Sequence, residues 1–176
     1  MKKTLCLCLW LIVLIGFSGP ACAWLQSGEP APDFELSDLD GNKVRLSDFQ
    51  GRIILLQLGT TWCPDCLRQS RDLLEMDDFL FRHEAVVVKV FFQENRGRVI
   101  RFMQDKNFTV SQAVLLDDGR VHRAYRVFPI PRLLIIDRRF RIVRDGLRPA
   151  TGEIQTLIAG LDQTVTADSN AEEVEH

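Results

Sequence analysis

The sequence has little of what would identify several large classes of protein. Its longest uncharged, mostly apolar run covers residues 4–17, about 14 residues, whereas a membrane-spanning helix needs roughly 20. Basic residues are not in excess, since 22 Lys and Arg against 24 Asp and Glu give a net charge of −2, so no global positive field favours nucleic acid. Internal repeats and low-complexity tracts are absent. What remains, 46% apolar and 26% charged residues in a chain of 176, is typical of a soluble globular protein with one core.

The first 23 residues predict export from the cytosol. Two lysines precede the apolar run, Ser18-Gly19-Pro20 ends any helix, and Ala21-Cys22-Ala23 offers small residues where a signal peptidase cleaves. We therefore expect a signal peptide over residues 1–23 and a periplasmic mature protein. An uncleaved membrane anchor is the main alternative, and a lipid-modified Cys22 is a third.

Cysteine is scarce outside this segment. Of five cysteines, only Cys63 and Cys66 belong to the mature chain. In an oxidising compartment, such a lone pair forms either a structural bridge or a redox centre. A bridge that closes so short a loop restricts the unfolded chain very little, because the entropic gain grows with the logarithm of loop length. The spacing therefore favours redox chemistry.

Hydrophobic periodicity predicts an α/β fold with a mixed central sheet flanked by helices. Alternation around the turn signal Asp40-Gly41-Asn42 predicts an N-terminal β-hairpin, with strands over residues 33–36 and 43–46. Five further strands are predicted at residues 53–58, 85–92, 113–116, 132–137 and 140–145. Helices are predicted at residues 64–82, 96–107, 121–127 and 151–161, the last with Thr151 as its N-cap. The core side of the first helix is expected to hold Leu67, Leu74, Phe79 and Leu80.

These elements make one predicted domain over residues 24–162. The residues that follow, 163–176, are polar and contain four acidic side chains but no Lys or Arg. A segment of this composition has too little apolar surface to bury, so we expect a disordered acidic tail.

The segment Trp62-Cys63-Pro64-Asp65-Cys66 lies where a buried strand gives way to a helix. Cys63 falls at the helix start, where unpaired backbone N–H groups and the helix dipole favour an anion. Cys66 follows one turn later on the same face, and Pro64 is tolerated in the first turn because its missing N–H had no partner there. Such a pair exchanges with a substrate disulfide: Cys63 attacks, and the more buried Cys66 resolves the mixed disulfide.

Two cysteines at this spacing could instead bind zinc. A closed zinc site needs four ligands, however, and the mature body has no third cysteine. Its histidines, His83, His122 and His176, are isolated from one another in the sequence. We therefore expect no metal and no other cofactor.

A second element is expected opposite Cys63. Pro131 opens a strand after a loop, a place where a cis peptide bond can turn the backbone and leave Ile130 free to pair with an extended substrate. Since only about one X–Pro bond in twenty is cis, the local sequence alone favours an ordinary trans proline.

Taken together, these motifs resemble the thioredoxin superfamily, and within it the extracytoplasmic TlpA/ResA class. The resemblance covers residues 28–162 and rests on the Cys-Pro-Asp-Cys motif, on a Pro-Arg strand start about 65 residues later, and on three runs, at residues 28–38, 44–51 and 58–62. It implies a thioredoxin fold in which Cys63 attacks, Cys66 resolves and Pro131 is cis. Many members of the class serve cytochrome c maturation.

We expect the substrate contacts to be Trp62, Ile130 and Pro131. Pro64, Asp65 and Arg132 would tune the two thiols. Arg132 stands where thioredoxins usually have Thr; pointed at Cys63 it would favour the thiolate and a more oxidising disulfide, while Asp65 acts in the opposite direction. The alternative for Arg132 is a solvated side chain at a strand start.

Besides Arg132, two further positions depart from the family pattern. Many relatives carry an acidic proton carrier three residues after the second cysteine, where this chain has Gln69. Thioredoxins carry a buried carboxylate six residues before the first cysteine, where this chain has Gln57. An amide cannot take a proton from Cys66, so water or a distant group must do so, or exchange is slower than in relatives.

The leading hypothesis is a periplasmic thiol–disulfide oxidoreductase that reduces protein disulfides, draws electrons from a membrane donor and acts as a monomer. A peroxiredoxin-like peroxidase is an alternative, because Thr60 and Cys63 fit that family's motif, although Leu56 replaces its proline. A non-catalytic thioredoxin-fold module that holds Cu(I) on Cys63 and Cys66 is the other.

Overall fold

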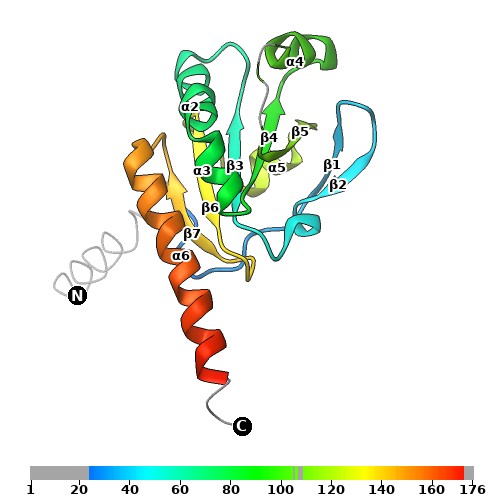
Figure 1. Ribbon diagram of the computed structural model, residues 1–176. Helices are drawn as coiled ribbons and strands as arrows, with labels where there is room; N and C mark the ends of the chain where they lie inside the picture. The colour runs from blue at the N-terminus through cyan, green and yellow to red at the C-terminus, as the bar shows by residue number, and fades with distance from the viewer. Residues whose placement is uncertain (1–23, 105, 107–108, 173–176) are drawn as a thin grey trace, which may run out of the picture.

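The computed structural model describes residues 24–104, 106 and 109–172, so the predicted signal peptide, residues 1–23, lies outside the described residues. A seven-stranded sheet in the order β2-β1-β5-β4-β3-β6-β7 runs through the molecule (Figure 1). Its strands are β1 (Glu35–Asp38), β2 (Lys43–Arg45), β3 (Ile54–Gly59), β4 (Val86–Phe92), β5 (Ser111–Asp117), β6 (Arg132–Ile136) and β7 (Ile142–Gly146). The centre, β5-β4-β3, is parallel, and every other pairing is antiparallel. The predicted mixed sheet is confirmed.

The predicted N-terminal hairpin is present and belongs to the sheet. β1 and β2 pair antiparallel with Leu36 opposite Val44, across a turn in which Gly41 has a positive φ of 93°. β1 also pairs with β5, opposite Leu115 and Leu116. The hairpin therefore extends the central sheet at one edge.

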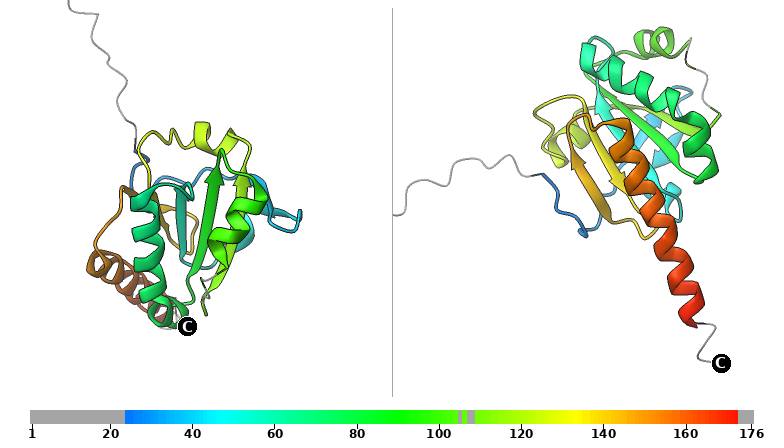
Figure 2. Two further views of the ribbon diagram at one scale, coloured as in Figure 1. Left: turned by 90° about the horizontal axis from the view of Figure 1, so that it is seen from above. Right: turned by 60° about the vertical axis from the view of Figure 1, so that its left-hand side comes forward.

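Helices cover both faces of the sheet because its central strands are apolar on both sides. One face carries α2 (Pro64–Glu75), α3 (Asp77–Arg82) and α6 (Thr151–Glu172), as Figures 1 and 2 show. Between these helices and the sheet lies an apolar core that contains Ile53, Leu55, Leu73, Leu80, Ile154 and Ile158. The opposite face is covered by α5 (Arg120–Ala124), the 3-10 helix η1 (Leu46–Phe49) and the N-terminal segment, around Leu56, Val88, Leu134 and Tyr125. The remaining helix, α4 (Arg96–Met103), follows β4.

The helix predicted over residues 64–82 is two helices, and its predicted core side was wrong in part. The chain leaves helical geometry at Met76, and the carboxylate of Asp77 accepts hydrogen bonds from the backbone N–H groups of Thr109 (2.6 Å) and Val110 (3.0 Å). Leu67 is 36% exposed, while Leu73 is buried. The buried side of α2 continues from Cys66 through Gln69, Ser70 and Leu73, as spacings of three and four residues require.

The C-terminal helix is longer than predicted. α6 starts at Thr151, which is its first helical residue rather than its N-cap, since the amides of Glu153 and Ile154 donate to the carbonyl of Ala150. It runs to Glu172 instead of ending near Leu161, so residues 163–172 of the predicted disordered tail are helical (Figure 2). No Gly or Pro follows Gly160 to interrupt it. Among the described residues, no helix has both the length and the apolar character needed to cross a membrane.

The N-terminal segment runs along the outer edge of β7. The backbone N–H of Gly28 donates to Ile142, the N–H of Ile142 donates to Glu29, and that of Ala31 donates to Phe140. Pro30 forms a bridge with Arg141. The segment therefore supplies backbone partners for an edge strand that β6 pairs on one side only.

Arg132 departs from both sequence-based expectations. It is fully buried rather than solvated, and its guanidinium binds Asp145 (Nε to Oδ1, 2.6 Å) and the carbonyl of Tyr125. The ring of Trp24 lies 5.0 Å from the guanidinium carbon, and the N–H of Leu25 donates to the other oxygen of Asp145 (2.7 Å). Strand alternation explains this placement, because Arg132 shares its face with Leu134 and Ile136, opposite the face that α2 covers.

Removal of one partner should reveal the cost of a lone buried charge. We expect Asp145→Asn to lower the free energy of unfolding by about 3 kcal/mol, because Arg132 would keep its charge and lose its counter-ion. Urea unfolding measures this change. The control is Asp118→Asn, which breaks the exposed ion pair with Arg120 and should have little measurable effect. Equal, small losses in the two variants would contradict this account of the buried pair.

Candidate active site

Cys63 lies at the end of the loop that connects β3 to α2. β3 ends at Gly59, and Cys63 is the N-cap of α2, with Pro64 as the first helical residue. Its Sγ accepts a hydrogen bond from the backbone N–H of Cys66 (3.2 Å). The predicted helix start is confirmed, and the sulfur occupies the position where a cap accepts one of the unpaired helix N–H groups.

Cys66 lies beneath Cys63, deeper in the protein. Both cysteines are buried, unbridged thiols, and the Cys66 sulfur packs over Gly59 at the end of β3. Burial, followed by the interaction with Cys63, raises the pKa of the Cys66 thiol to about 12. Asp65 adds a small effect in the same direction. Cys66 therefore holds its proton at neutral pH.

The loop before β6 faces the first cysteine. The Ile130-Pro131 peptide bond is cis, as the family resemblance implies. The carbonyl oxygen of Ile130 lies 4.0 Å from Cys63 Sγ. The structure thus brings Cys63, Cys66, Ile130 and Pro131 together, from segments more than 60 residues apart.

Two predicted tuning residues lie apart from the sulfurs. Asp65 is exposed and pairs with Arg68 on the outer side of α2. The charge of Arg132 is matched by Asp145 rather than directed at Cys63, so the tuning role predicted for Arg132 lacks a structural basis.

Glu94 holds the loop that leads to Cys63, a role that sequence reasoning missed. Its Oε1 accepts hydrogen bonds from the backbone N–H (2.8 Å) and the hydroxyl (2.6 Å) of Thr61. Its second oxygen pairs with Arg98 (3.2 Å), and the Glu94 side chain has no exposed surface. A usable signal existed: Glu94 follows β4, and the carboxyl ends of neighbouring parallel strands meet at one edge of a sheet.

Large apolar side chains are exposed in the segments that flank Cys63. Trp62 precedes it and is 60% exposed, and Phe128, in the loop that leads to Pro131, is 88% exposed. Leu67, on the first turns of α2, is exposed as well. Phe128 was not among the predicted contacts. Exposed apolar residues beside a reactive group are typical of surfaces that receive another polypeptide.

A strip of polar side chains lies between α2 and the sheet, under Cys66. It consists of Gln57, Gln69, Ser70 and Lys89, all nearly inaccessible to water. Gln57 Nε2 donates to the carbonyl of Cys66 (3.3 Å). Both polar atoms of the Gln69 amide lack a hydrogen-bond partner among the described residues. Lys89 is the only charged residue in β4 and, unlike Gln57 and Gln69, was not among the residues singled out in the sequence.

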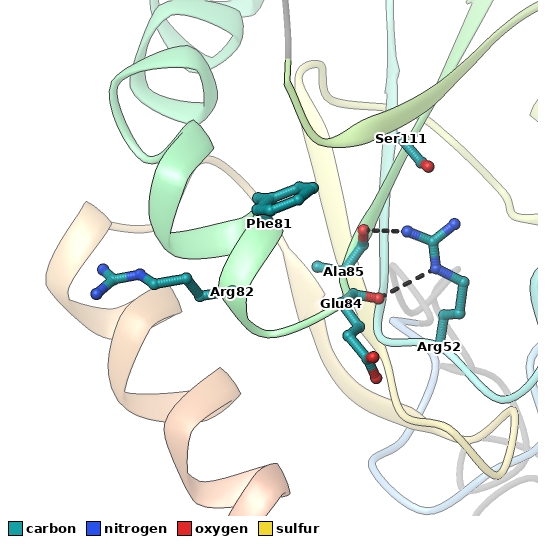
Figure 3. A pocket seen from close by; sticks show the side chains of 6 residues that line it. All are labelled: Arg52, Phe81, Arg82, Glu84, Ala85 and Ser111. Carbon is teal, nitrogen blue, oxygen red and sulfur yellow. Dashed lines mark hydrogen bonds between the residues drawn. The ribbon is translucent and has the colours of Figure 1, made fainter.

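A hollow elsewhere in the molecule does not belong to this site. It is lined by Arg52, Phe81, Arg82, Glu84, Ala85 and Ser111 (Figure 3). These residues lie around the amino ends of the parallel strands, whereas Cys63 follows the carboxyl end of β3. The Arg52 guanidinium donates hydrogen bonds there to the backbone carbonyls of Glu84 (3.1 Å) and Ala85 (2.7 Å), so its contacts in the hollow are with the protein's own backbone. Within the described residues, no group of three or more His, Cys, Asp or Glu could hold a metal ion.

Comparison with known proteins identifies the family to which this chain belongs. The sequence pattern of the AhpC/TSA family matches residues 27–145. The chain belongs to this family. The thioredoxin-like protein YneN of Bacillus subtilis is 30% identical over 143 residues, covering 73% of this chain and 81% of the relative. The thiol-disulfide oxidoreductase ResA of the same organism is 30% identical over 121 residues, covering 68% of this chain and 66% of the relative.

Solved structures of similar fold lead to the same family of proteins. A crystal structure described as a thiol-disulfide oxidoreductase from Bacteroides vulgatus superposes with a TM-score of 0.68 at 30% identity, covering 78% of this chain and 97% of that chain. The thioredoxin domain of a second thiol-disulfide oxidoreductase from that organism shares the fold, with a TM-score of 0.65 at 22% identity. The fold and the superfamily predicted from the sequence are confirmed. This AhpC/TSA family member is a thiol–disulfide oxidoreductase of the thioredoxin superfamily.

The close approach of Cys66 to β3 generates a prediction. A Cβ at Gly59 would lie 2.9 Å from Cys66 Sγ, so the sulfur or the strand must shift. We expect Gly59→Ala to cost about 1–3 kcal/mol of stability and to slow disulfide exchange, measured by urea unfolding and by insulin reduction. Gly152→Ala is the control, because nothing lies within 4 Å of that Cβ on α6. A Gly59→Ala variant as stable and as active as wild type would contradict the packing.

The raised pKa of Cys66 predicts a pH dependence of stability. The thiol of Cys66 has an ordinary pKa of 9.0 and a pKa of about 12 in the folded protein. As the pH rises, the unfolded chain therefore loses this proton before the folded protein does. The contribution to stability is complete below pH 9 and is lost as the pH approaches 12. We expect the reduced wild type to lose stability more steeply over this range than reduced Cys66→Ala, measured by urea unfolding at each pH. Parallel curves would show that Cys66 ionises normally.

Proposed function

We propose that this protein is a periplasmic enzyme that reduces disulfides in exported proteins, with an apocytochrome c as the first candidate substrate. The observation that carries the proposal is the placement of Cys63 at the cap of α2, with the protonated Cys66 beneath it and the carbonyl of Ile130 opposite. We infer the reductive direction and the substrate from the TlpA/ResA resemblance. We infer the compartment from that resemblance and from the export signal predicted over residues 1–23. The proposed catalytic unit is residues 24–162.

The chemistry needs two exchange steps. The Cys63 thiolate attacks one sulfur of the substrate disulfide, forming a Cys63–substrate disulfide and releasing the other substrate sulfur as a thiolate. Cys66 then loses its proton and attacks Cys63 Sγ, which releases the second substrate thiolate and leaves a Cys63–Cys66 disulfide. No cofactor takes part. Because no thiol buffer keeps the periplasm reducing, a membrane electron donor must return two electrons to the enzyme.

The substrate contacts follow from what is exposed around Cys63. Trp62 and Phe128 offer apolar surface on the segments that flank the sulfur, and Ile130 and Pro131 offer backbone beside it. Pro64 fixes the first turn of α2, and Asp65 adds negative charge near Cys66. We propose that an extended substrate segment lies across these residues, and that the enzyme works as a monomer.

Trapping tests the proposal directly. Full-length Cys66→Ala, expressed with its signal, should accumulate in the periplasm as mixed disulfides through Cys63, because the resolving thiol is gone. The adducts should vanish on treatment with dithiothreitol and should be missing from the matched control Cys63→Ala. Mass spectrometry of the trapped proteins identifies the substrate. Equal recovery of adducts from both variants would refute attack by Cys63.

Redox titration of the Cys63/Cys66 pair tests the direction. A potential close to that of a strong oxidant, about −120 mV, would contradict a reductive role, whereas a thioredoxin-like value of about −270 mV supports it. Rapid peroxide consumption by Cys66→Ser would favour the peroxiredoxin alternative. Retention of copper without disulfide reduction would favour the copper-binding module.

A further inference from the structure

The second exchange step requires a group that accepts the proton of the Cys66 thiol. Cys66 must give up its proton before it attacks Cys63, yet its burial holds the thiol protonated at neutral pH. The two positions where relatives carry carboxylates hold Gln57 and Gln69, and an amide does not accept a proton in this pH range. This inference rests on the proposed function and concerns where that proton goes.

Lys89 is the ionisable residue built into the strip under Cys66. It lies on β4 directly opposite Gln57 of β3, on the face that α2 covers, and it is completely buried. Lys89 Nζ lies 3.3 Å from Ser70 Oγ, and Ser70 Oγ lies 3.3 Å from Gln57 Oε1. Ser70 is one helical turn after Cys66, on the same buried side of α2.

Gln57 completes the connection to the cysteine. Its amide oxygen accepts from Ser70, and its amide nitrogen donates to the carbonyl of Cys66. Hydrogen bonds therefore join the amine of Lys89, through Ser70 and Gln57, to the backbone carbonyl of Cys66, and they hold the lysine and the cysteine in one buried network. The cysteine, the serine and the lysine are thus held together in a region without water access, where charges interact strongly.

The surroundings of Lys89 suit it to accept a proton. Burial lowers the pKa of the amine to about 7, and the positive charge of Lys106, beyond α4, acts in the same direction. From α2 the titratable group on its face is Cys66, and from β3 the neighbour is the neutral Gln57. A fraction of Lys89 is therefore an unprotonated amine near neutral pH, and a thiolate at Cys66 would favour the ammonium form.

We propose that Lys89 takes up the proton of Cys66 when Cys66 attacks the mixed disulfide. In this step the Cys66 S–H bond breaks, a Cys66–Cys63 bond forms, and the bond between Cys63 and the substrate sulfur breaks. The proton converts the Lys89 amine to ammonium, and the electron pair leaves with the substrate as a thiolate. The ammonium later returns its proton when a donor regenerates the Cys66 thiol.

A two-phase reaction isolates this step. Reduced full-length protein is mixed with 5,5′-dithiobis(2-nitrobenzoate): Cys63 releases the first nitrothiolate, and attack by Cys66 releases the second. In the wild type, the rate of the second phase should rise through about pH 7 and then level off. In Lys89→Met the second phase should be about 100-fold slower at pH 7 and should keep rising toward the pKa of Cys66 itself.

Controls separate a proton-holding role from a structural one. The matched control Lys43→Met removes an exposed lysine from β2 and should leave both phases unchanged. Lys89→Arg keeps the charge but cannot act as the acceptor, so it should be as slow as Lys89→Met. A wild-type pH profile in Lys89→Met, or full rescue by Lys89→Arg, would overturn the assignment. A wild type that lacks the second phase would instead overturn the proposed function.

A measurement on the unmodified protein covers the case in which the variants fail to fold. In protein labelled with ¹³C-lysine, the Cε signal of Lys89 should titrate near neutral pH in the reduced wild type. A signal that stays in the ammonium form up to pH 10 would overturn the proposal without any substitution.

Discussion

The hydrogen bond from the backbone N–H of Cys66 to the sulfur of Cys63 is the contact on which the site depends. It fixes the attacking sulfur at the first turn of α2 and leaves the second sulfur one turn further in, over Gly59. Other parts of the fold keep this turn in place: β3 brings the chain to it, Glu94 binds the connecting loop through Thr61, and the loop before β6 presents Ile130 opposite. The sheet thus acts as a rigid support for two sulfur atoms, and this suits a reaction in which only those atoms change partners.

Much of the fold could be predicted because its signals are local. The continuous apolar runs of β3 and β4 reflect strands covered on both faces, and the Asp40-Gly41-Asn42 turn sets the hairpin. The helix start at Pro64 and the adjacent cysteines could likewise be read from neighbouring residues. The cis geometry at Pro131 could not, since local sequence favoured trans, and only the family resemblance indicated it.

The errors arose where a distant partner decides the outcome. Arg132 is buried because Asp145, 13 residues away on β7, supplies its counter-ion. The break at Met76 accompanies the contact of Asp77 with backbone 32 residues further on. Lys89 interrupts a run of valines, and only the register against Gln57 shows that it faces α2. Residues 163–172 look too polar to fold, yet without a helix breaker α6 continues through them. Such pairings are set by topology, which a single sequence does not display.

The segment of residues 28–31, which lies along the outer edge of β7, has a consequence for how copies of this protein meet. An uncovered edge strand offers its carbonyl and amide groups to any extended chain, including a second molecule. Here the segment of residues 28–31 already binds the carbonyls of Phe140 and Ile142 and the N–H of Ile142, and the bond from Leu25 to Asp145 fastens it. An extended polypeptide therefore cannot pair with the chain at the start of β7 unless it displaces residues 28–31. Residues 28–31 thus discourage self-association at this part of the sheet edge.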